Sequence, residues 1–315
     1  MNKRTNLIVA TVVAGVATLS VPAAAYVRTT TSTGVPTAWK APCITMEFSL
    51  GAPPPKLDGA AYLAAAQQAG ETWTQASLDG VNRCSNVRFS VDSVDDTGGQ
   101  VGKDGHNRMI FRQASWCRDP PPTDPNEPPC YAPQALAITS VFQWRTTGEI
   151  LDADMEINAH DFTWGDFAAD PIVFDPNTHD FLGTVTHEMG HVIGLDHTCF
   201  NPGQTRNGVP VPNPVDNKGN PVPACDLLTN PETIKQATMY VSVADNQAEV
   251  GLRSLSPDDA QGACEIYPIK NNFVCLPPSS TETGGGCSYP ATPGPVSIAF
   301  VLALLGLAVA IRRRR

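Results

Sequence analysis

The chain has 315 residues and a formal net charge of −10, with 31 acidic against 21 basic residues. Six of the basic residues, namely Lys3, Arg4 and the four arginines at 312–315, lie at the two ends of the chain. The part between the ends has 15 basic and 31 acidic residues, a formal charge of −16. Such a surface repels nucleic-acid phosphates and anionic lipid, so we expect neither nucleic acid nor a membrane surface as a partner of this part.

Residues 1–25 have the pattern of a secretory signal peptide. Lys3 and Arg4 begin it, and the apolar run 7–19 is too short to span a membrane comfortably. The small residues 23–25 form a cleavage site. The alternative is an uncleaved N-terminal anchor. We expect an exported protein whose mature chain begins at residue 26.

Hydrophobic periodicity then predicts strands and helices in chain order. Residues 26–42 are expected to be an extended lead-in. Alternating residues predict five strands, over 43–49, 86–94, 107–112, 135–144 and 149–158. Helices are predicted over 58–78, 181–195 and 256–267, with Asp58, Asp180 and Ser256 as their N-caps.

The order of these elements predicts the fold class. Strands cluster early and helices late, which favours one α+β domain over 26–268 with a twisted mixed five-stranded sheet. Two Cys-containing stretches, 115–133 and 198–236, are rich in Pro and are expected to be loops. Residues 269–286 are expected to be a linker.

Nine cysteines are present, and setting Cys287 aside leaves eight. An even count in an exported chain predicts up to four disulfides, but the sequence cannot choose among the pairings. Pairing of neighbours is our hypothesis, namely 43–84, 117–130, 199–225 and 264–275. The chain has no C-x-x-C spacing, which disfavours a cysteine-based zinc site.

Residues 187–197 read HEMGHVIGLDH. On a helix, positions four apart share a face, so His187 and His191 can bind one metal ion. A catalytic zinc usually takes three protein ligands, and His197 can be the third if the helix stops abruptly. Gly194 permits the left-handed conformation that such a stop needs. Glu188 is then placed at the open side of the metal as a general base. The alternative, ordinary histidines on a helix, does not account for this spacing.

The extended motif resembles that of the metzincin clan of zinc metallopeptidases, and within it the matrixins. Met239, in the segment ATMY over 237–240, matches the Met-turn of that clan, and the segment 255–267 resembles a downstream matrixin helix. The matrixin pro-domain motif PRCGxPD is missing, and Val241-Ser-Val243 replaces the usual Pro-x-Tyr after the Met-turn.

The resemblance implies a zinc endopeptidase that acts on proteins or peptides, with zinc on the three histidines and Glu188 as the base. It also implies that strand 135–144 is the edge with which an extended substrate pairs; an ordinary covered edge is the alternative. A catalytically inactive surface-binding module that retains a structural zinc is the main functional alternative, and a zinc aminopeptidase is another. We expect a monomer.

Acidic residues alternate along the last predicted strand. Asp152, Asp154 and Glu156 share one face and are a candidate calcium site, since matrixins use calcium structurally. The alternative that we favour is a solvated strand face. His106, His160 and His179 are interpreted as surface residues, with a second metal at His160 or His179 as the alternative.

The C-terminal end carries a second export feature. Cys287 precedes an apolar run over 296–311, and four arginines follow it. This arrangement resembles the myxobacterial C-terminal sorting tail, so residues 287–315 are predicted to be a sorting or membrane-anchor tail. A plain membrane anchor is the alternative. The membrane is expected to be a partner only through this tail.

Overall fold

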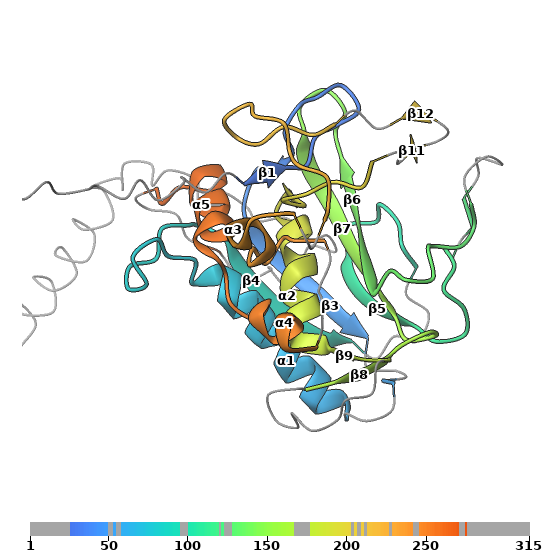
Figure 1. Ribbon diagram of the computed structural model, residues 1–315. Helices are drawn as coiled ribbons and strands as arrows, with labels where there is room; N and C mark the ends of the chain where they lie inside the picture. Colours follow the sequence, from blue (N-terminus) through green and yellow to red (C-terminus); the bar gives the residue numbers. More distant parts are fainter. Residues whose placement is uncertain are drawn as a thin grey trace, which may run out of the picture.

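The computed structural model describes most of the region between the two ends (Figure 1). The described residues are 26–49, 53–54, 58–94, 100–119, 121–122, 128–166, 177–202, 205–206, 209–210, 213–226, 229–241, 246–270 and 275. The predicted signal peptide, the sorting tail and nearly all of the linker lie outside them. Within them, every helix falls short of the length and apolar character that crossing a membrane requires.

A mixed, mainly parallel sheet forms the centre of an α+β domain, as predicted. Its order is β2-β7-β5-β3-β4, and β6 also pairs with β7. Only the β6–β7 pairing of this sheet is antiparallel. The strands are β2 (Ala38–Trp39), β3 (Cys43–Ser49), β4 (Arg88–Val94), β5 (Asn107–Arg112), β6 (Ala137–Gln143) and β7 (Glu149–Asn158).

The sheet has six strands, so the predicted five is one too few. The additional strand is β2, which is two residues long and pairs with the first residues of β7. A pair of residues is too short to show periodicity. The predicted bounds of β3, β5 and β7 are confirmed to the residue, because side chains there alternate between core and surface or bury in a continuous run.

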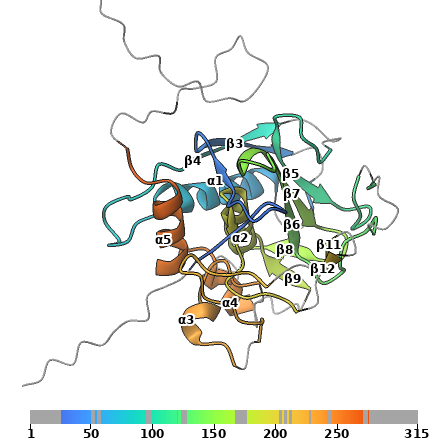
Figure 2. The same cartoon turned by 90° about the horizontal axis from the view of Figure 1, so that it is seen from above.

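Two long helices cover one face of the sheet and lie side by side (Figure 1, Figure 2). They are α1 (Gly59–Thr74) and α2 (Phe181–Val192), capped by the side chains of Asp58 and Asp180 as predicted. Helix α1 buries Tyr62, Ala66, Ala69 and Trp73 at four-residue and three-residue spacing. The core between helices and sheet includes edge-to-face aromatic contacts, such as Tyr62 with Phe181 at 4.8 Å between ring centroids.

Short elements complete the domain. The predicted lead-in contains β1 (Val27–Arg28), which pairs with β10 (Leu195–Asp196), and β8 (Thr163–Gly165) pairs with β9 (Thr178–Asp180). A further hairpin joins β11 (Thr205–Arg206) to β12 (Val209–Pro210). Helices α3 (Glu232–Lys235) and α4 (Asn246–Gly251) precede α5 (Pro257–Ile266). Helix α5 begins with the predicted Ser256 cap, and Asp259 completes a capping box.

Four disulfides join the eight cysteines, but only two of the predicted pairs are confirmed. These are Cys117–Cys130 and Cys199–Cys225, which close short loops. The predicted pairs 43–84 and 264–275 are wrong, because the chain forms Cys43–Cys275 and Cys84–Cys264 instead. Helix α5 returns to the segment between α1 and β4, so partners distant in sequence become neighbours. Disulfides of this kind are typical of proteins outside the reducing cytoplasm.

Candidate metal centre

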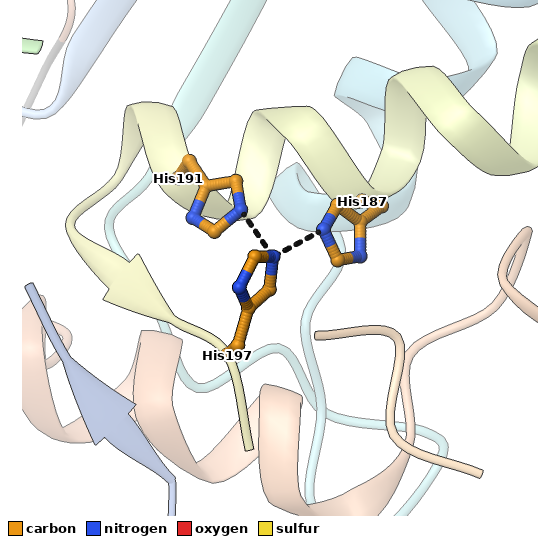
Figure 3. Close-up of side chains that lie close together, drawn as sticks. All are labelled: His187, His191 and His197. Atoms are coloured by element: carbon orange, nitrogen blue, oxygen red, sulfur yellow. Dashed lines mark hydrogen bonds between the residues drawn. The ribbon is translucent and has the colours of Figure 1, made fainter. Parts of the chain in front are cut away.

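Helix α2 carries the first two histidines on one face. It begins at Asp180, whose carboxylate accepts a hydrogen bond of 2.8 Å from the Gly183 amide and contacts the Arg253 guanidinium. Almost every residue of α2 is buried, so the helix is fixed on all sides. The spacing of four residues directs the rings of His187 and His191 the same way (Figure 3).

The chain turns sharply after α2, as the sequence predicts. The helix ends at Val192, and Gly194 has a φ of +87°, a left-handed conformation that favours glycine. A Cβ at this position would lie 2.6 Å from the carbonyl oxygen of Thr37. Strand β10 then pairs with β1, and the following residue, His197, points its ring back toward α2 (Figure 3).

The three rings meet at their Nε2 atoms. Nε2 of His197 lies 3.1 Å from Nε2 of His187 and 3.1 Å from Nε2 of His191. Two nitrogens bound to one tetrahedral zinc ion at ~2.0–2.1 Å lie about 3.3 Å apart, so the observed spacing suits such an ion. Among the described residues these histidines are the only group of three or more potential ligands whose atoms all lie within 4.8 Å of one another.

The outer nitrogens of the α2 histidines show which ring atoms carry protons. Nδ1 of His187 lies 2.6 Å from the Thr238 carbonyl oxygen, and Nδ1 of His191 lies 2.9 Å from that of Leu195. A carbonyl oxygen only accepts, so both Nδ1 atoms donate, and each Nε2 of a neutral ring holds a lone pair. A neutral His197 ring carries one proton, so its Nε2 atom cannot donate a full hydrogen bond to the lone pairs of both His187 and His191. The residues therefore fit a bound metal ion better than a set of hydrogen bonds.

The same surroundings favour the neutral form of two of the rings, His187 and His197. Burial, followed by the nearby His191, lowers the pKa of His187. Burial lowers the pKa of His197 well below its ordinary value, and His191 and His187 add to the effect. A protonated imidazole cannot bind a metal ion, so these shifts favour the form that can.

Glu188 lies next to this cluster and is only 5% exposed. Its Oε2 atom accepts a hydrogen bond of 2.7 Å from the hydroxyl of Thr139, which belongs to β6. Thr139 was not singled out from the sequence. The signal in the sequence is a hydroxyl on the same strand face as Ala137 and Val141, two apolar residues that pack against the core.

Met239 lies against α2, in the turn that the sequence predicts. Its side chain is buried, and a Cβ at Gly190 would lie 2.2 Å from its Sδ atom. The carboxylate of Asp259, on α5, accepts hydrogen bonds from the amides of Thr238 at 2.7 Å and Met239 at 3.2 Å. Since the Thr238 carbonyl accepts from His187, Asp259 is linked through this turn to the first of the three histidines. Neither Gly190 nor Asp259 was singled out as part of the centre from the sequence.

The acidic residues of β7 are not the solvated face that we favoured, because all three are fully buried. Asp152 accepts from the Asp104 and Gly105 amides, and Asp154 from the Gly102 and Arg108 amides. Glu156 pairs instead with Arg112 and Tyr131. Strand alternation places these side chains on one face of the sheet, and the loops that cross this face bury them. The three carboxylates do not gather around one point, and calcium binding there stays a prediction.

The remaining histidines each contact a carboxylate. Nδ1 of His106 lies 2.7 Å from Glu47, that of His160 lies 2.8 Å from Asp161, and that of His179 lies 2.7 Å from Glu249. His106 and His160 are exposed, as interpreted from the sequence, whereas His179 is half-buried. None of them belongs to a second metal-binding group within the described residues.

No protein-family model matches this chain, and no curated protein matches it. The chemistry of the centre therefore rests on its own geometry: three imidazoles that can hold a metal ion, with one carboxylate beside them.

Proposed function

We propose that the chain is an exported zinc-dependent endopeptidase of the metzincin clan, similar to the matrixins. The observation that carries the proposal is the convergence of the Nε2 atoms of the three histidines. In the two histidines on α2, the opposite ring nitrogen, Nδ1, donates its proton to a backbone carbonyl. Catalytic zinc centres commonly use three protein ligands and keep a fourth position open, whereas structural centres use four. The described residues bring three ligands together, which favours a catalytic role.

Glu188 is the general base of the proposed reaction. A zinc ion held by the three histidines supplies Lewis acidity and lowers the pKa of a bound water to about 7. Glu188 accepts a proton from the attacking water and returns it to the amine that leaves, so the peptide bond is exchanged for a carboxylic acid and an amine. Burial of Glu188 keeps its carboxylate in one place beside the ligands.

Strand β6 supports a peptide as the substrate. Within the described residues it pairs along one edge only, with β7. The Asn158 amide donates to the Leu136 carbonyl, so by antiparallel alternation the backbone groups of residues 137, 139 and 141 face the other edge. An extended peptide can add there as a strand, and such backbone pairing tolerates many side chains, as an endopeptidase requires.

The test of the function uses one variant and a matched control. Glu188→Ala should keep its metal and fold but lose cleavage of casein and of a peptide library. Glu71→Ala, an exposed glutamate on α1, should cleave like the wild type. Chelation should abolish wild-type cleavage, and zinc should restore it. Unimpaired cleavage by Glu188→Ala would refute the assigned base.

A second test separates the enzyme from an inactive binding module. His191→Ala should lose the metal, which mass spectrometry of the native protein and elemental analysis can follow. A wild-type protein that binds zinc but cleaves no member of a peptide library would favour the binding module. A variant that retains one zinc ion per chain would argue against the three-histidine centre itself.

Export is the proposed setting of this activity. Four disulfides form within the described residues, and such bonds persist in oxidising compartments. Mass spectrometry of the protein from its native host would establish both termini. Recovery of uncleaved chain from the cytoplasm with free thiols would contradict export.

A further inference from the structure

The hydroxyl of Thr139 is the feature that reaches beyond the proposed function. Thr139 lies in the middle of β6, between Ala137 and Val141, which pack against the hydrophobic core on the side of α2. A hydroxyl at such a position has to find a polar partner, because burying it alone is unfavourable. Its partner is the carboxylate of Glu188, at 2.7 Å.

The contact fixes one oxygen of the Glu188 carboxylate. Thr139 donates to Oε2, and the same hydroxyl also lies 3.4 Å from the Glu188 carbonyl oxygen. A hydrogen bond to a carboxylate is roughly twice as strong as one between neutral groups. With Oε2 held, Oε1 is the oxygen left to exchange a proton with water. The hydroxyl thus selects one orientation of the base.

The backbone of Thr139 belongs to the edge strand with which we expect the peptide to pair. Antiparallel alternation directs its amide and carbonyl away from β7, while its side chain points to α2. One residue therefore joins the strand that receives the substrate to the carboxylate that acts on it.

We propose that Thr139 is a positioning residue that orients Glu188 for proton transfer and aligns it with the peptide bound along β6. This inference rests on the proposed endopeptidase function. Thr139 itself exchanges no proton with the substrate, so its removal should slow turnover without weakening binding of substrate or metal.

The experiment compares three variants in the metal-loaded full chain. Thr139→Val keeps the shape and packing of the side chain and removes only the hydroxyl, so kcat should fall about 10-fold while KM stays within about twofold. Thr139→Ser keeps the hydroxyl and should retain most of kcat. Ser90→Ala, which removes an exposed hydroxyl from β4, is the control and should match the wild type.

Two readouts do not depend on activity. Zinc content and thermal midpoint of Thr139→Val should equal those of the wild type, and its crystal structure should show the Glu188 carboxylate turned from its wild-type orientation. An unchanged carboxylate, or a kcat equal to that of the wild type, would overturn the inference. Loss of zinc or of thermal stability would instead make Thr139 a structural residue. If the wild type cleaves nothing, the function fails, and the crystal structure still decides whether Thr139 orients Glu188.

Discussion

Gly190 lies between the two α2 histidines at a point where the helix has no room for a side chain. A Cβ there would lie 2.2 Å from Sδ of Met239 and 2.9 Å from Cζ2 of Trp73. Both distances are well below the ~3.5–4.0 Å that non-bonded atoms prefer. Gly190→Ala therefore forces either the Met239 side chain or the Trp73 ring to move away from α2.

The magnitude follows from two opposed effects. Alanine in place of glycine inside a helix contributes about 1 kcal/mol of stability. Overpacking a core by one methyl group costs about 1–3 kcal/mol, and the upper part of that range applies because Trp73 is held by its 2.7 Å hydrogen bond to the Thr186 carbonyl. We expect a net loss of about 2 kcal/mol in the free energy of unfolding.

Urea unfolding of the metal-free protein measures this loss. Gly251→Ala, at the end of α4, is the matched control, because nothing lies within 4 Å of a Cβ there. It should be neutral or stabilising by up to about 1 kcal/mol. In the double variant Gly190→Ala/Met239→Ala the methyl group regains space, so its loss should be about 1–3 kcal/mol smaller than the sum of the single losses. Additive losses, or a Gly190→Ala variant as stable as the wild type, would refute the packing argument.

Three further predictions concern the turn, the buried acids and the metal. Gly194→Ala should cost about 2 kcal/mol in urea unfolding, because its φ of +87° and a Cβ contact of 2.6 Å with backbone both oppose a side chain. Burial raises the pKa of Asp154 to about 7, so the folded chain holds a proton that the unfolded chain releases near pH 4; stability from this group is lost as pH rises through 7. The fall in unfolding free energy between about pH 4 and 7 should flatten in Asp154→Asn and persist in Asp92→Asn, an exposed control on β4. Protons compete with zinc for the imidazoles, and burial lowers the pKa of His187 and His197. Zinc-loaded protein that is dialysed at a series of pH values should therefore release half its zinc only below the ordinary imidazole pKa of 6.5. Release above pH 7 would contradict this.

The features that the sequence predicted well are local. Asp180 and Ser256 cap helices through contacts with the next three residues, so their roles can be read from short stretches of sequence. Gly194 ends α2 for an equally local reason, its positive φ. The spacing of His187, His191 and His197 encodes the centre because one helix and one tight turn suffice to bring them together.

The features that were missed depend on contacts between distant parts of the chain. β2 exists only because β7 lies beside it, and the pairing of Cys43 with Cys275 crosses 232 positions. The burial of Asp152 likewise depends on loop residues 104 and 105, which donate to its carboxylate. Strand alternation shows that Asp152 and Asp154 share a face, but it does not show whether water or another segment covers that face.

The route from Asp259 through Thr238 to His187 has a consequence for when the three histidines can bind a metal ion. Helix α5 is the last helix of the described chain, and its carboxylate holds the turn whose carbonyl orients the first ligand. A chain synthesised only as far as the histidine motif lacks that support. We therefore expect metal uptake to follow completion of the fold, so that the three histidines gather around an ion only after α5 has docked.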